Sequence, residues 1–164
     1  MSEAEASAGR PRNMVIDIAA VPVKRGSGYP PEFQGPVATR EKQALGDAAG
    51  LKNFGVNLVR VPPGTDSTQR HWHSRQDEFV YVLEGELTLV TDAGAQVLTA
   101  GMCAGFPANS GDGHVLRNLS DTDAVYLEVG DRTPGDEVDY PDVDMQVKEV
   151  DGVRRPLHRD GTPY

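Results

Sequence analysis

Hydrophobic and polar residues alternate in short segments through the middle of the chain, a pattern typical of β-strands with one face in a core. Between these segments lie clusters of turn formers, among them Pro62-Pro63-Gly64 and Asp92-Ala93-Gly94. The strands expected from this pattern cover residues 54–61, 79–83, 86–91, 96–99, 114–118 and 124–129. Short strands at regular intervals predict an all-β sandwich or barrel.

The segments on either side of this region have a weaker pattern. Residues 15–23 form a short apolar run that predicts a strand, and residues 39–49 predict a helical turn or two, although Gly46 disfavours a helix. A chain of 164 residues suits a single domain. Its expected parts are a flexible tail (1–13), an N-terminal extension with a strand and a short helix (14–53), the barrel (54–130) and a C-terminal extension that packs on the barrel or a partner subunit (131–164).

Composition narrows the classes of function. The formal net charge is −9 and no run of Lys or Arg interrupts it, so we expect no nucleic-acid partner. The single cysteine, Cys103, excludes an internal disulfide and favours a reducing compartment such as the cytoplasm. We expect no membrane association, because the chain has neither a signal-like apolar start nor a segment long enough to cross a bilayer.

Candidate chemistry begins at a His-x-His pair. Side chains two apart in a strand point the same way, so His71 and His73 can present two imidazoles to one point. Glu78 would face the opposite side of a continuous strand, but a turn in the polar insert 74–77 resets the register. Glu78 and Val80 then face inward together, with the carboxylate at the mouth of the barrel.

A third imidazole comes from a later segment. His114 begins a strand after a polar loop, and it shares a face with Leu116 and Asn118. Three neutral imidazoles and one carboxylate suit one divalent transition metal, namely Fe, Mn, Ni, Co, Cu or Zn, and ligand type alone does not choose between them. An octahedral ion held in this way keeps open positions for water, dioxygen or substrate, as catalytic sites do.

The two segments resemble the paired motifs of the cupin superfamily. The first motif consists of a glycine, a His-x-His pair, a glutamate and a second glycine, matched here by Gly64, His71, His73, Glu78 and Gly85. The second motif is matched by Gly101, Pro107, His114 and Asn118. This sequence departs from the second motif in two ways, because Asn109 stands where glycine is usual and two extra residues precede His114.

The resemblance covers residues 54–130, and the C-terminal tail is similar to that of a largely uncharacterised group of bacterial single-domain cupins. It implies a double-stranded β-helix, or jelly-roll barrel, with short helical or irregular extensions at both ends. It also implies one metal ion held by His71, His73, Glu78 and His114, with Glu78 as a candidate catalytic base. Cupins commonly pair through edge strands, so the resemblance implies a homodimer.

Further residues are candidates for contact with a small-molecule substrate. Gln69 has the parity of the two histidines, although a solvated loop end is an equal alternative, and Arg60 is either an anchor for an anionic group or a surface charge. Apolar side chains are expected to line a pocket beside the metal. The full set of candidates is Arg60, Gln69, Val80, Phe106, Leu116 and Asn118.

The sequence therefore predicts a metal-dependent enzyme that acts on a small oxygenated metabolite. Dioxygenase-type chemistry is slightly favoured, because it needs the expected apolar pocket and a redox metal. The alternative is a sugar or sugar-phosphate isomerase, epimerase or lyase, which needs a cationic phosphate anchor that the scattered arginines do not obviously provide. An alternative of another class is a non-catalytic small-molecule-binding or sensory cupin.

Overall fold

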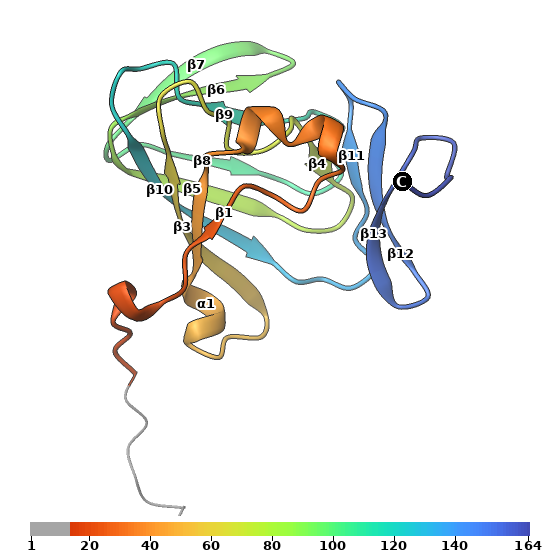
Figure 1. Ribbon diagram of the computed structural model, residues 1–164, viewed down its shortest axis with the longest axis horizontal. Helices are drawn as coiled ribbons and strands as arrows, with labels where there is room; N and C mark the ends of the chain where they lie inside the picture. The colour runs from red at the N-terminus through yellow and green to blue at the C-terminus, as the bar shows by residue number, and fades with distance from the viewer. Residues whose placement is uncertain (1–13) are drawn as a thin grey trace, which may run out of the picture.

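The computed structural model describes residues 14–164, and the tail expected over residues 1–13 lies outside them. Strands dominate the fold, with one α-helix and several 3₁₀ turns (Figure 1). The strands are β1 (Lys24–Arg25), β2 (Glu41–Ala44), β3 (Phe54–Val61), β4 (Trp72–His73), β5 (Glu78–Glu84), β6 (Glu86–Thr91), β7 (Gly94–Thr99), β8 (Cys103–Phe106), β9 (Val115–Arg117), β10 (Ala124–Asp131), β11 (Val138–Tyr140), β12 (Met145–Val150) and β13 (Val153–Leu157). The helices are η2 (Ile18–Ala20), η3 (Pro31–Phe33), η4 (Gly35–Val37) and α1 (Leu45–Ala48).

The strands form antiparallel sheets that close into a jelly-roll barrel, which confirms the expected all-β fold. One layer is a six-stranded sheet in the order β1-β2-β3-β10-β5-β8. The opposite layer combines the sheets β7-β6-β9 and β13-β12-β11-β4. Isolated bridges between Asp66 and Arg117 and between His71 and His114 join these two sheets, so the ligand-bearing segment lies beside β9.

The core lies between the two layers. In β5, Val80 and Val82 are buried whereas Phe79, Tyr81 and Leu83 are exposed, as expected for a strand with one face inward. The same alternation in the neighbouring strands completes one apolar cluster inside the barrel. Its buried members are Val59, Val61, Val80, Val82, Leu87, Leu89, Leu98, Leu116, Ala124 and Tyr126.

The turn between β5 and β6 depends on Gly85. Its φ is +73°, in the left-handed region that L side chains rarely adopt. A Cβ atom built at this position would lie 2.5 Å from the carbonyl oxygen of Asp123, so a side chain has no room. The turn therefore requires glycine for both its backbone conformation and its close packing.

The N-terminal extension differs from two expectations. Residues 15–23 were expected to be a strand, but they contain the 3₁₀ turn η2, which the Asp17 carboxylate caps by accepting from the backbone N–H of Ala19. Residues 39–49 were expected to be helical, but their first half forms strand β2 and only α1 is helical. Pairing of β2 with β3 along the edge of the barrel outweighs the local preference for a helix.

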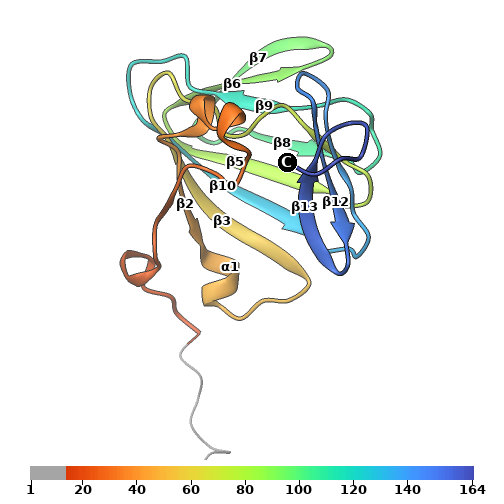
Figure 2. The same ribbon diagram turned by 45° about the vertical axis from the view of Figure 1, so that its right-hand side comes forward.

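The C-terminal segment forms strands rather than the turns that its composition suggests. Strand β11 pairs with β4, which places Val138 opposite His73 (Figure 1). Strands β12 and β13 extend this sheet (Figure 2). A second cluster of buried residues, Val138, Tyr140 and Met145, packs against Tyr29 and Phe33 of the N-terminal extension. Both extensions therefore meet beside the barrel. Among residues 14–164, no helix combines the length and apolar character needed to cross a membrane.

Candidate metal centre

Four side chains from in or beside strands β4, β5 and β9 converge at one end of the barrel. His71 lies just before β4, His73 is the last residue of β4, and Glu78 is the first residue of β5. His114 directly precedes β9 and is bridged to His71 by two backbone hydrogen bonds, of 3.2 and 2.9 Å. The turn at residues 74–77 resets the register of the strand. Glu78 therefore lies on the same face of β5 as Val80 and Val82, which are buried inside the barrel.

The four side chains point at one another. The Oε2 atom of Glu78 lies 3.0 Å from Nε2 of His114 and 3.4 Å from Nε2 of both His71 and His73. Ligand atoms of His71, His73 and Glu78 all lie within 4.8 Å of one another, a spacing that can hold a metal ion. The structure therefore brings together the four residues predicted as ligands.

Hydrogen bonds orient two of the imidazoles. Nδ1 of His71 lies 2.9 Å from the backbone carbonyl oxygen of Gln69, and Nδ1 of His73 lies 2.7 Å from a carboxylate oxygen of Asp136. Because these oxygens can only accept, each Nδ1 must donate its hydrogen. In the neutral imidazole each Nε2 then carries a free lone pair that faces Glu78, which is how outer partners orient metal-binding histidines.

His114 is held by packing instead. Its ring stacks on Phe106 with the centroids 3.6 Å apart and the planes parallel within 1°. Its Nδ1 atom is buried and has no hydrogen-bond partner among the described residues. Phe106 therefore positions this imidazole, and it also lines a space of about 280 Å³ beside Glu78, as the sequence led us to expect.

These residues fit a divalent metal ion. Oε2 of Glu78 is buried and has no hydrogen-bond partner within the described part of the chain, although three imidazoles surround it. A buried charged oxygen without a partner is costly, and a cation among the four ligand atoms would remove that cost. The donor set of three imidazole nitrogens and one carboxylate suits a transition metal.

Electrostatics agree with an ionised carboxylate at this point. Burial raises the pKa of Glu78, but the imidazoles of His114 and His71 outweigh that effect and hold the pKa well below its usual range. The carboxylate is therefore charged at neutral pH. A metal ligand of this type must be ionised, so the carboxylate is in the state that a metal ion requires.

Asp136, which sequence reasoning missed, organises the loop around the cluster. Its side chain is 1% exposed and accepts hydrogen bonds from the backbone N–H groups of Arg75 and Gln76, at 2.9 and 3.3 Å. Arg154 of β13 lies 3.3 Å from the same carboxylate, so this group links the C-terminal strands to His73. Only its place in an acidic, turn-rich tail marks Asp136 in the sequence, and that signal does not single it out.

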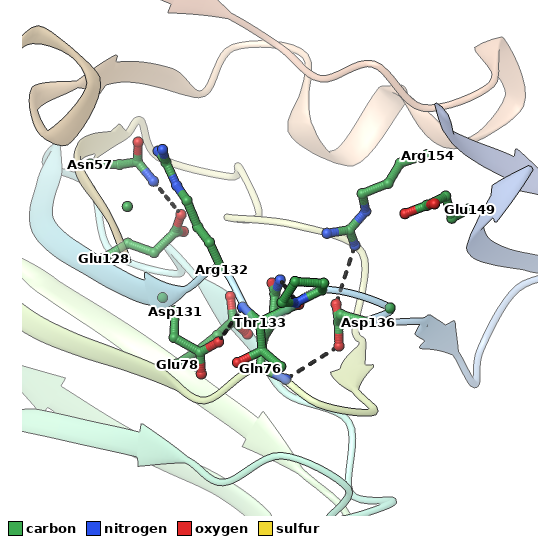
Figure 3. A pocket seen from close by; sticks show the side chains of 14 residues that line it. Asn57, Gln76, Glu78, Glu128, Asp131, Arg132, Thr133, Asp136, Glu149 and Arg154 are labelled. Atoms are coloured by element: carbon green, nitrogen blue, oxygen red, sulfur yellow. Dashed lines mark hydrogen bonds and ion pairs between the residues drawn. The ribbon is translucent and has the colours of Figure 1, made fainter. Parts of the chain in front are cut away.

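A polar cavity of about 580 Å³ opens beside Glu78 (Figure 3). Two arginines line it, Arg132 from the end of β10 and Arg154 from β13, together with several carboxylates. Arg132 forms an ion pair with Asp47, and Arg154 forms one with Asp136. The lining residues are Gly55, Asn57, Gln76, Glu78, Glu128, Gly130, Asp131, Arg132, Thr133, Pro134, Gly135, Asp136, Glu149 and Arg154.

Three substrate-contact candidates lie near the ligands but serve the structure. Gln69 donates from Nε2 to the carbonyl oxygen of Phe33 at 2.8 Å, which ties the loop to the N-terminal extension. Val80 and Leu116 are core residues, and the space between them and the histidines is only about 10 Å³. Among the described residues, the apolar space beside the ligands is therefore not the one expected between Val80 and Leu116, but a space of about 280 Å³ that Phe106 and Pro107 line together with Glu78.

Two further candidates lie away from the ligands. Arg60 is half-exposed, and its guanidinium pairs with Asp123 at 3.2 Å near the opposite end of β3. Asn118 is fully buried and donates to the carbonyl oxygens of Val61 and Thr122 at 2.7 Å each, so it stabilises a turn. The parity that groups Asn118 with His114 holds within a strand, but β9 ends at Arg117.

Comparison with known proteins gives a consistent result. The Cupin domain family matches residues 57–130. A solved structure from Silicibacter pomeroyi, a sugar phosphate isomerase from a cupin superfamily by name, is 43% identical and covers 92% of this chain and 96% of its own, with a TM-score of 0.87. A predicted oxalate decarboxylase from Thermotoga maritima is 23% identical over 73% of this chain and all of its own, with a TM-score of 0.61, and shows the same fold. Among curated proteins, none matches the chain.

Proposed function

Since the chain belongs to the cupin superfamily, we propose that it is a metal-dependent enzyme that isomerises a small hydroxylated carbonyl compound, either a sugar or a sugar phosphate. The observation that carries this proposal is the polar cavity of about 580 Å³ that shares Glu78 with the ligand cluster. The protein named a sugar phosphate isomerase, which is 43% identical, supports the same substrate class.

The cavity favours an isomerase over the dioxygenase that the sequence slightly favoured. A dioxygenase for an apolar substrate needs apolar walls beside the metal, but Val80 and Leu116 are packed into the core, and the space that Phe106 and Pro107 line is about half the volume of the polar cavity. The larger space beside Glu78 is instead lined by carboxylates, two amides, a hydroxyl and two guanidinium groups. Such groups pair with the hydroxyl and carbonyl oxygens of a sugar.

Each group of residues would have its own role in the proposed reaction. His71, His73, Glu78 and His114 would hold one divalent ion, which when bound polarises a carbonyl or hydroxyl oxygen of the substrate. Arg132 and Arg154 lie on the cavity wall, where they can donate to substrate oxygens or to a phosphate. Asp136 keeps Arg154 and His73 in fixed positions through its carboxylate.

The test is direct measurement of isomerisation. Purified protein is analysed for metal, loaded with each candidate ion in turn, and incubated with a panel of aldoses and aldose phosphates while ketose formation is followed by NMR. We expect turnover with at least one sugar, and its loss together with metal in His73→Ala. His158→Ala is the matched control, because His158 pairs with Asp144 outside the cluster.

Two outcomes would overturn the proposal. Binding of sugars without turnover, under every metal, would instead favour a non-catalytic sensory or binding barrel. Full metal content in His73→Ala would show that the ligand set is wrong.

We also propose that the protein is a homodimer. The outward face of β5 presents Phe79, Tyr81 and Leu83, all of which remain exposed. A row of large apolar side chains on a sheet is typical of a protein–protein contact, and a second copy of the chain is the simplest partner. Light scattering after size exclusion should give twice the chain mass of 17.7 kDa, and Tyr81→Lys should shift it towards the monomer.

A further inference from the structure

One charged group inside the barrel has no part in the metal cluster. Glu128 lies on β10, opposite Asn57 of β3 and Val80 of β5. Its carboxylate accepts from Nζ of Lys42 at 2.8 Å and from Nδ2 of Asn57 at 2.9 Å, and the hydroxyl of Tyr126 lies 3.4 Å from its second oxygen. The barrel therefore holds a partly buried ion pair between β2 and β10, with Asn57 of β3 as a further hydrogen-bond donor.

This carboxylate faces the place where a substrate would lie. Glu128 lines the polar cavity together with Glu78, and Figure 3 shows it on the wall beside Asn57 and Arg132. It also lines the small inner space that contains His71 and His114. Among the residues that line either space, only Glu78 and Glu128 line both. A sugar in contact with the ligand cluster would thus lie between these two carboxylates.

The ion pair has no clear structural purpose. Taking two charges partly out of water costs desolvation free energy, and an apolar pair of similar volume is often as stable or more so. Burial raises the pKa of Glu128, but the Lys42 ammonium outweighs that effect and keeps the pKa below its usual value. The carboxylate is therefore ionised at neutral pH, the form in which a carboxylate can act as a base.

The other carboxylates of the cavity are less suited to proton transfer. Oε2 of Glu78 points at the three imidazoles and is committed to the ligand cluster. The Asp136 carboxylate is already occupied by His73 and Arg154. Asp131 accepts from the backbone N–H groups of Asp77 and Thr133, and Glu149 is exposed on the rim.

We propose that Glu128 is the general base that carries the proton during isomerisation, an inference that rests on the proposed function. The Glu128 carboxylate takes the proton from C2 of the aldose, the electrons of the C2–H bond form a C1=C2 double bond, and the π electrons of the C1=O bond move onto the C1 oxygen to give an enediolate. A second proton then passes from the C2 hydroxyl to the C1 oxygen, the C2 oxygen forms the C2=O bond, and the electrons of the C1=C2 bond take the proton back from the Glu128 carboxylate at C1. The product is the ketose, and no oxidant or reductant is needed.

The decisive experiment compares Glu128→Gln with the wild type, which is first assayed on the sugar panel described above. We expect kcat to fall by about 10²- to 10⁴-fold, the usual contribution of a general base, because the amide cannot accept the proton. Exchange of the substrate C2 hydrogen with deuterium from solvent, followed by NMR, should be lost as well. Metal content, and the affinity for the matching sugar alcohol measured by calorimetry, should stay as in the wild type.

Two variants serve as controls. Glu128→Asp keeps a carboxylate one methylene shorter and should recover part of the lost kcat, which separates chemistry from folding. Glu41 lies beside Lys42 on β2, outside the cavity, and its carboxylate pairs with Arg25 at 2.7 Å. Glu41→Gln should therefore leave activity unchanged.

The outcomes separate the two proposals. Wild-type turnover with unchanged kcat and exchange in Glu128→Gln would refute the role of Glu128 alone. Absence of turnover in the wild type would refute the proposed function, and the role of Glu128 with it.

Discussion

Replacing Asp136 with asparagine tests whether this buried carboxylate sets the chemistry of His73. In the wild type the carboxylate accepts from Nδ1 of His73 at 2.7 Å, which leaves Nε2 free to bind metal. In Asp136→Asn the amide oxygen can still accept from the backbone N–H groups of Arg75 and Gln76. Its NH₂ group would then face His73 and favour the tautomer with the hydrogen on Nε2, which blocks that atom as a ligand.

The expected loss follows from the role of such outer partners. Their removal usually costs 10- to 100-fold in metal affinity. That range corresponds to about 1.4 to 2.8 kcal/mol, at about 1.4 kcal/mol for each factor of ten. Arg154, which lies 3.3 Å from the carboxylate, would lose its ion pair as well, but its effect on the metal passes only through Asp136.

Competition with a chromophoric chelator measures the affinity, and the visible spectrum of the Co(II)-loaded protein reports the ligand geometry. Asp144→Asn is the matched control, because Asp144 accepts from Nδ1 of His158 at 2.8 Å in an Asp–His pair outside the cluster. We expect weaker binding and a changed spectrum for Asp136→Asn only. Equal affinities for the wild type and a folded Asp136→Asn would refute the reasoning.

Three further predictions concern packing, metal and the turn. Phe106→Ala should weaken metal binding between about 2-fold and 10-fold in the chelator assay, because an aromatic stack of about 0.5 to 1.5 kcal/mol positions His114; unchanged affinity would exclude a positioning role. Chelation of the metal should lower the free energy of unfolding in urea by about 2.7 kcal/mol relative to protein with metal at about 100 times its Kd. Superimposable urea curves would argue against a bound ion. Metal affinity should also fall in acid, because the imidazoles take up protons. Gly85→Ala should cost more than about 1 kcal/mol of stability, because the backbone is left-handed and Asp123 blocks the Cβ; Gly94→Ala, at a positive φ with open space, should cost less.

The sequence predicted the residues whose direction depends on local spacing. His71 and His73 lie two apart, and the polar turn at 74–77 reverses the parity for Glu78, so their convergence follows from strand geometry alone. The inward alternation of Val80 and Val82 follows from the same rule. The central strands are correct for this reason, because each carries its own pattern of burial.

Contacts between distant segments were not predictable from spacing. Asp136 meets His73 across 63 positions, and Glu128 meets Lys42 across 86. No periodic pattern marks either carboxylate, since each is defined only by what the fold places opposite it. Strand β11 was missed for a related reason, because its pairing with β4 stabilises a segment whose own composition favours turns.

The pairing of β11 with β4 also bears on the order in which the residues of the site are synthesised. All four ligand residues precede Asp136 in the chain, and the strand that presents His73 acquires its neighbour only from residues 138–140. During synthesis the ligands therefore leave the ribosome before the carboxylate that orients one of them. We therefore expect a chain that ends at β10 to bind a metal ion more weakly than the complete barrel, because it lacks the Asp136 carboxylate beside His73.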